Sequence, residues 1–181
     1  MTYPGYLYGD LLPELIRGYW WDIGLKTNWE IVDRSTLETK VSQNNVEGFI
    51  YLYSRNLVIP ADPNFFLGTV SDGTWMPRWG KWFVSGGEKG LEPPSHHPIR
   101  QVWANWDKAK TAPNKTKADA YIQKIIDIHK ENLWVIGILG ELPVPVIVNN
   151  KLGNVPTFGM AVDDLRGTGI AQPAQFFFKK Q

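Results

Sequence analysis

Cysteine is absent from the 181-residue chain. This absence excludes disulfides, thiolate metal sites, iron–sulfur clusters and cysteine nucleophiles together. An excess of charge is also missing, because 19 basic and 18 acidic residues leave a net charge of +1. We therefore expect no nucleic-acid partner and no binding to an anionic membrane surface. The longest apolar run, residues 133–139, is interrupted by Gly137 and falls short of the roughly 18 residues that a membrane span needs.

The common signatures of catalysis are missing too. The sequence contains no G-x-S-x-G nucleophile elbow, no P-loop, no dinucleotide glycine fingerprint and no H-E-x-x-H zinc motif. Residues 86–90 are rich in glycine but lack the P-loop spacing, which favours an ordered turn. His96 and His97 are adjacent near a helix start and point in different directions, so they do not easily share one metal ion. We expect no catalytic residue, no metal and no cofactor.

Tryptophan, proline and glycine are abundant instead, with nine, 13 and 17 residues. Tryptophan is costly to expose, and it serves either to fill a core or to grip flat apolar ligands and sugar rings. Residues 54–94 show no helical or strand periodicity, although they include Trp75, Trp79 and Trp82. An irregular stretch of this length is unusual in a compact domain, so we predict an ordered loop that its tryptophans hold in place.

Hydrophobic periodicity predicts alternating helices and strands before this loop. Apolar side chains at helical spacing predict a helix capped by Asp10 and ended by Gly24, and strict alternation predicts a half-buried strand over residues 25–31. A capping box at residues 35–38 opens a second helix, and residues 49–53 are predicted to form a buried strand. This order of elements predicts α/β packing with a parallel pair of strands.

Two antiparallel helices are predicted after the loop, capped by Ser95 and Thr116. Strands are expected at residues 133–139 and 146–148, and the apolar residues 176–178 should need a partner surface. Periodic positions also predict that Trp103 and Trp134 belong to the core, and that His129 is partly buried with a hydrogen-bond partner.

The tryptophan-rich loop is the best functional candidate in the sequence. Its tryptophans either line a ligand cleft or anchor the loop on the domain's own core, and the sequence leaves both open. Four carboxylates lie in the same region, those of Asp62, Asp72, Glu88 and Glu92. A glycosidase needs two carboxylates about 5–10 Å apart across a cleft, and the sequence does not specify such a separation.

Several segments together resemble the second lobe of family 5 extracellular solute-binding proteins, the dipeptide- and oligopeptide-binding components of ABC importers. No single segment is specific, but their joint occurrence covers nearly the whole chain. They are YWWDIGL (19–25) with VDRS (32–35), WGKW (79–82) with GGEKG (86–90) and EPP (92–94), NLWVIG (132–137) with PVIV (145–148), and L-x-N-V-P (152–156) with FFF (176–178).

The resemblance implies an α/β lobe like that of type II periplasmic-binding proteins, with a mixed sheet, flanking helices and a long Trp/Pro/Gly-rich ordered loop. Residues 1–149 would form the second lobe, and residues 150–181 would cross back to an N-terminal lobe of a longer parent. The implied function is capture of a peptide between two lobes for import, without catalysis. The implied partners are ABC permease subunits, and the implied location is periplasmic or extracellular and membrane-tethered. Residues 1–5 do not begin a signal peptide.

The expected ligand contacts are Tyr53, Arg55, Asn56, Trp75 and Trp79, because segments just past strand ends often build the sites of α/β proteins. One departure from the family pattern matters. Peptide-binding members commonly carry an aspartate shortly after the strand equivalent to residues 49–53, and it pairs with the ligand's α-amine. In this chain, residues 54–61 contain no acidic residue, and the first acid after the strand is Asp62. An oligosaccharide is therefore the alternative ligand, and Arg55 would instead meet a ligand carboxylate.

Two other classes of function stay open from the residues alone. One is a carbohydrate-active enzyme that uses tryptophan platforms and two loop acids such as Glu88 and Glu92. The other is a structural or interaction module whose residues 176–178 dock on a partner, or self-associate where no partner is present.

Overall fold

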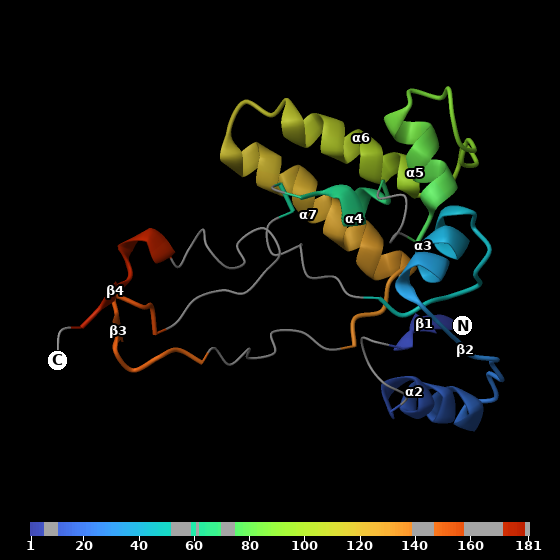
Figure 1. Ribbon diagram of the computed structural model, residues 1–181. Coiled ribbons are helices and arrows are strands. Elements are labelled where there is room, and N and C mark those ends of the chain that lie inside the picture. Colours follow the sequence, from blue (N-terminus) through green and yellow to red (C-terminus); the bar gives the residue numbers. More distant parts are fainter. Residues whose placement is uncertain are drawn as a thin grey trace.

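The computed structural model describes residues 1–5, 11–51, 59–60, 62–69, 75–138, 147–157 and 172–179 (Figure 1). Within this part of the chain, helices outnumber short strands. The elements in order are β1 (Thr2–Pro4), α2 (Leu11–Asp22), β2 (Glu30–Val32), α3 (Arg34–Ser42), α4 (Asn64–Leu67), α5 (Pro77–Val84), α6 (Ile99–Lys110), α7 (Lys115–Asn132), β3 (Leu152–Gly153), the 3-10 helix η1 (Pro173–Gln175) and β4 (Phe177–Phe178).

The core lies where α4 and α5 pack beside the antiparallel pair of α6 and α7 (Figure 1). Ile99, Val102 and Ile125 are fully buried there, at the helical spacing that the sequence predicts. Trp103 is 4% exposed, and its indole Nε1 donates to the Leu67 carbonyl at 2.9 Å. The predicted burial of Trp103 is therefore confirmed, and the same hydrogen bond fastens α4 to α6.

A small parallel sheet forms the other part of the described body. β1 lies at its centre and pairs with β2 on one side, with Thr2 opposite Glu30. On the other side Thr2 forms a parallel bridge with Phe49. The first predicted strand thus forms only in part, parallel to β1, and the described part of the second is reduced to the bridge at Phe49, with β1 between them. β1 itself is not predicted, because three residues ending in Pro4 carry no period that distinguishes a strand.

The predicted strands are longer than the observed ones. Of residues 25–31 only 30 and 31 belong to a strand, because β1 offers a partner of just three residues. Residues 133–138 and 147–148 form no strand either, so these predictions are wrong for the described residues. Residues 52–53, 139 and 146 of the predicted strands lie outside the described part of the chain.

Three of the predicted helix caps are also wrong, and for two of them a neighbouring residue takes the role. Asp33, rather than Ser35, caps α3 and accepts from the Thr36 amide at 3.0 Å. Asn114, rather than Thr116, caps α7, accepting from the Lys117 amide at 3.0 Å. Helix α6 begins after Pro98, beyond the predicted cap Ser95. Asp10 lies outside the described residues, whereas Gly24 ends the turn after α2 with a φ of 86°, as predicted.

Part of the predicted irregular loop is helical. Both α4 and α5 fall within it, the first ended by Gly68 at a φ of 66° and the second begun by Pro77. Helices of four and eight residues are too short to produce a clear period. The predicted role of the tryptophans is confirmed for Trp75, whose Nε1 donates to the Phe65 carbonyl at 3.1 Å, and for Trp82, which stacks on Trp103.

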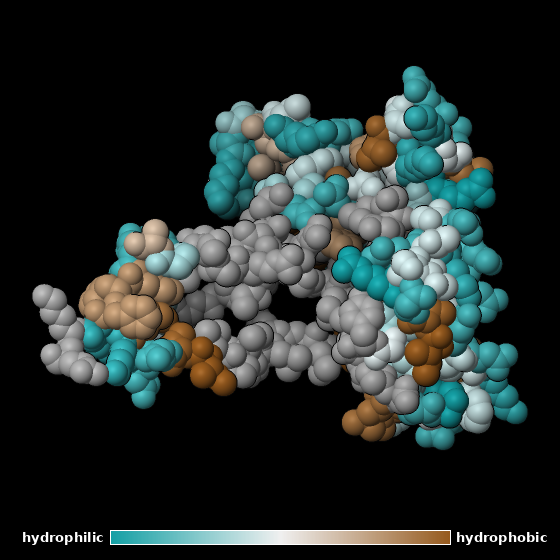
Figure 2. Space-filling view, in the orientation of Figure 1, coloured by the Kyte–Doolittle hydropathy of each residue, from teal (hydrophilic) through white to brown (hydrophobic). Residues whose placement is uncertain are grey.

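The C-terminal residues form a small two-stranded arm, which we define as residues 147–157 and 172–179. It lies away from the helices in Figure 1. β3 and β4 pair antiparallel there, with Gly153 opposite Phe177. Apolar surface gathers on the arm in Figure 2, where Ile147, Phe177 and Phe178 are 97%, 56% and 72% exposed. Self-association through this surface remains a prediction.

Candidate ligand-binding site

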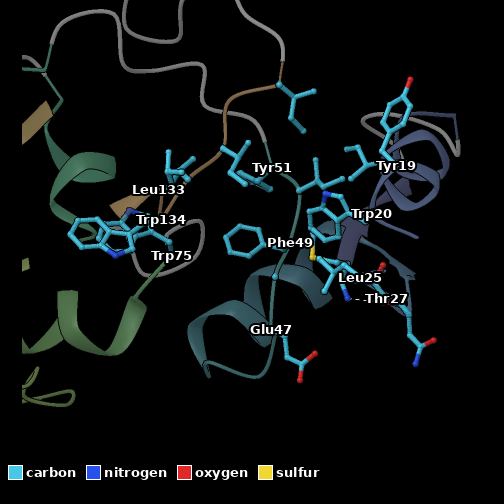
Figure 3. Close-up of a pocket in the computed structure, with 18 of the residues that line it drawn as sticks. Tyr19, Trp20, Leu25, Thr27, Glu47, Phe49, Tyr51, Trp75, Leu133 and Trp134 are labelled. Carbon is cyan, nitrogen blue, oxygen red and sulfur yellow. Dashed lines mark hydrogen bonds between the residues drawn. The ribbon is translucent and has the colours of Figure 1, made fainter. Parts of the chain in front are cut away.

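A groove of about 910 Å³ lies between the small sheet and the segment that follows α7 (Figure 3). Its described lining is mostly aromatic and aliphatic. The principal side chains are those of Ile16, Tyr19, Trp20, Leu25, Phe49, Ile50, Tyr51, Trp75, Leu133, Trp134, Val135, Ile136 and Ile138. An apolar concavity of this size is the kind of surface that holds a ligand.

One wall of the groove is a pair of stacked tryptophans. Trp75 and Trp134 lie almost parallel, with an interplanar angle of 15° and ring centroids 4.4 Å apart (Figure 3). His97 stacks on Trp134 as well, at 5.6 Å and 20°. His129 meets both tryptophans edge-on, at 5.5 and 5.2 Å. We call Trp75 and Trp134 the tryptophan wall; it is fixed from several directions before any ligand arrives.

The opposite side of the groove comes from α2 and the segment after it. The ring centroids of Trp20 and Trp29 are 6.0 Å apart, and the Trp29 indole Nε1 donates to the Thr27 hydroxyl at 2.7 Å. Tyr51 lies between the two sides in Figure 3, and its hydroxyl donates to the Glu38 carboxylate of α3 at 3.3 Å. These contacts hold large aromatic side chains in place on a surface that stays accessible.

Charge is scarce in the groove. Among the lining residues that the structure describes, Lys26 and Glu47 are the cationic and carboxylate side chains. Glu88 and Glu92, the acids of the enzyme alternative, are absent from this lining; Glu92 is exposed and pairs with Arg100 at 2.7 Å. The described residues also contain no cluster of His, Asp or Glu suited to a metal ion. The arrangement suits binding of an apolar solute better than acid–base chemistry.

The two histidines beside the tryptophan wall have hydrogen-bond partners. His129 Nε2 lies 2.8 Å from the Phe66 carbonyl, and burial lowers the pKa of this ring although that hydrogen bond raises it. His97 Nδ1 accepts from the Ile99 amide at 3.2 Å, and burial together with the neighbouring His96 lowers the pKa of His97. The prediction that His129 is partly buried and hydrogen-bonded is confirmed.

The structure describes two of the five predicted ligand contacts, Trp75 and Trp79. Trp75 lines the groove. Trp79 lines a smaller cavity of about 270 Å³, which Trp75 also touches. Tyr53, Arg55 and Asn56 lie outside the described residues, so their roles remain predictions.

Sequence reasoning missed most of the groove's aromatic residues. The sequence places Trp134 in the core, yet this side chain is only half-buried and lines the groove. The sequence also places Trp20 on the apolar face of a helix, and Phe49 and Tyr51 in a buried strand. An apolar pattern does not say whether a face is covered, so the signal for these residues was indistinguishable from that of a core.

A comparison of sequences finds no matching protein-family model and no matching curated protein. Among solved structures, the oligopeptide-binding protein OppA is similar, with a TM-score of 0.73 and 24% sequence identity. The match covers 99% of this chain but 30% of that chain, so the present chain spans less than a third of OppA. Together with the mixed helices and strands, this likeness shows that the chain has the fold of part of OppA, which agrees with the α/β lobe that the sequence predicts.

Within the described residues, no helix has both the length and the apolar character needed to cross a membrane.

Proposed function

We propose that the chain is part of a two-lobed solute-binding protein of an ABC importer, and that its groove holds an extended, peptide-like solute for import. The observation that carries the proposal is an apolar, aromatic-lined groove with little charge, on a fold shared with a peptide-binding protein. Residues 1–149 would form one lobe and residues 150–181 would lead back to the other. The family resemblance supports permease subunits as partners and a periplasmic or membrane-tethered extracellular location.

A peptide suits the groove better than an oligosaccharide. Sugar rings stack on free aromatic faces, but the faces of Trp134 are engaged by Trp75 and by His97. Trp134 therefore offers an edge more than an open platform. Edges of indole rings and the branched side chains of Val135 and Ile136 pack well against aliphatic and aromatic side chains.

Closure of two lobes sequesters a ligand from water, and one lobe alone supplies only part of the contacts. We therefore expect binding to this chain to be weak and to need an excess of ligand. A ligand that binds the folded state at a hundred times its Kd stabilises that state by about 2.7 kcal/mol. Thermal shift is accordingly a sensitive test.

The experiment compares pools of short peptides rich in leucine and phenylalanine with pools of oligosaccharides, at millimolar concentration. We predict that a peptide pool raises the melting temperature and that the oligosaccharides leave it unchanged. Ile136→Lys should reduce the affinity about tenfold or more, because a buried isoleucine is worth roughly 1.5–3 kcal/mol. Ile136 is 69% exposed without ligand, so the substitution should cost little stability.

The matched control is Ile147→Lys, at a position 97% exposed and outside the groove lining. It should leave the peptide-induced shift intact. A shift with oligosaccharides but not with peptides, or an equal loss in both lysine variants, would contradict the proposal.

A further inference from the structure

His97 connects the start of α6 to the tryptophan wall. Its Nδ1 accepts a hydrogen bond from the Ile99 amide, in the first turn of the helix, at 3.2 Å. Pro98, the residue at the cap position, makes no side-chain hydrogen bond, and the imidazole satisfies one of the first-turn amides that have no acceptor within the helix. The same ring stacks on Trp134 and meets Trp79 edge-on, at 4.6 Å and 61°.

We propose that His97 is a positioning residue for the groove: it fixes the tryptophan wall while its ring is neutral and releases that wall when the ring is protonated. The chain of contacts is continuous. His97 stacks on Trp134, Trp134 stacks on Trp75 at 4.4 Å, and both tryptophans line the groove. The importance of the wall for a ligand rests on the proposed function, whereas its response to pH does not.

Protonation changes both contacts of the ring. An imidazolium carries N–H groups on both nitrogens, so Nδ1 would face the Ile99 amide as a donor and the hydrogen bond would be lost. A positive charge at the N-terminal end of α6 is also opposed by the helix dipole. The imidazole must then move, and Trp134 loses the ring on which it stacks.

The direction of the pH dependence follows from the surroundings of His97. Burial and the charge of His96 hold the pKa of His97 below its ordinary value of 6.5. As the pH falls below 6.5, the unfolded chain takes up the proton before the folded chain does. The stability that His97 contributes is therefore complete above pH 6.5 and declines as the pH falls toward the lowered pKa of the folded state.

Among the groups near the His97 ring, His96 is the one whose charge affects the pKa of His97. From α5 the ring meets Trp79 and from the segment after α7 it meets Trp134, and neither titrates. On α6, Arg100 is paired with Glu92. His129 touches the same wall from α7, and burial also lowers its pKa. His129 therefore needs a control of its own.

The test labels the protein with 5-fluorotryptophan and follows the fluorine resonance of Trp134 between pH 7.5 and 5, without ligand. Trp134→Phe identifies that resonance, and the titration of the His97 ring is recorded in parallel. We expect the Trp134 resonance to shift with the same midpoint as His97, below pH 6.5. His97→Asn should abolish the shift, because the amide oxygen accepts from the Ile99 amide without titrating, so the Trp134 resonance should be the same at both pH extremes.

Two further variants separate His97 from its neighbours. His96→Gln should retain the transition and raise its midpoint, since the nearby charge is removed. His129→Gln should also retain it, because its side-chain amide can still donate to the Phe66 carbonyl. The proposal is overturned if Trp134 stays unchanged while His97 titrates, or if His97→Asn leaves the transition intact. Failure of peptides to bind would leave these outcomes unaffected.

Discussion

Leu133 ends α7 in a conformation that its side chain does not favour. Its φ is 49°, in the left-handed region, and its amide donates to the His129 carbonyl at 2.9 Å. The side chain is 66% exposed and lines the groove. A position that turns the chain from α7 toward the tryptophan wall thus carries a leucine where glycine is the usual residue.

Leu133→Gly should therefore stabilise the protein by roughly 0.5–1 kcal/mol, because relief of left-handed strain exceeds the entropy that glycine loses. Denaturant unfolding measures the change. Asn44→Gly is the control, since Asn44 has a φ of 59° but asparagine tolerates this region. An equal gain at Asn44, or a loss at Leu133, would contradict the assignment of strain to Leu133.

At single residues, the sequence predicted burial better than it predicted function. Trp103 and His129 have the predicted environments because their helical positions specify the side of the helix they occupy. Trp75 lines the groove and Trp79 lines a second cavity, and the ligand contacts expected of both remain predictions. Trp79 lies on α5 and Trp75 just before it, and the sequence does not mark this division because a helix of eight residues has no clear period.

Among the elements, α5 is placed by a close approach of backbones. A Cβ added to Gly80 would lie 1.9 Å from the Gly68 carbonyl oxygen and 2.8 Å from the Gly68 carbonyl carbon. Gly80 thus allows α5 to lie directly on the turn that ends α4.

Gly80→Ala should destabilise the protein by about 3 kcal/mol, because the neighbouring atoms are backbone and cannot rotate away. The matched substitution is Gly18→Ala in α2, where an added Cβ meets nothing within 4 Å. It should instead stabilise the protein by about 0.5–1 kcal/mol through helix propensity. Thermal melts of the two variants distinguish the cases, and a harmless Gly80→Ala would disprove the close approach.

The long helices were predictable and the strands were not. The helices α2, α6 and α7 span three turns or more, so their apolar faces repeat often enough to be recognised. Helix caps were misplaced where several suitable residues adjoin. Asp33 rather than Ser35 is the N-cap of α3, because the Asp33 carboxylate accepts from the Ser35 and Thr36 hydroxyls as well as from the Thr36 amide. These hydrogen bonds also hold the pKa of Asp33 far below its usual range.

For the whole molecule, the family resemblance predicted the fold more fully than the periodicity did. The alternation at residues 25–31 and the apolar run at 133–138 suggested strands. Strands require partners, however, and the paired strands of the described parallel sheet are only three residues long. The same shortage of partners leaves both segments accessible beside the groove. The chain spans less than a third of OppA, which fits the proposal that an opposing lobe completes the binding surface.

The most direct test is hydrogen–deuterium exchange of the chain with and without the peptide that gives the largest thermal shift. The account predicts slower exchange at residues 134–138, 25–28 and 49–51, which border the groove, and unchanged exchange in the β3–β4 arm. Protection confined to the arm, or a thermal shift without protection around the groove, would contradict the claim that the groove is where the solute binds.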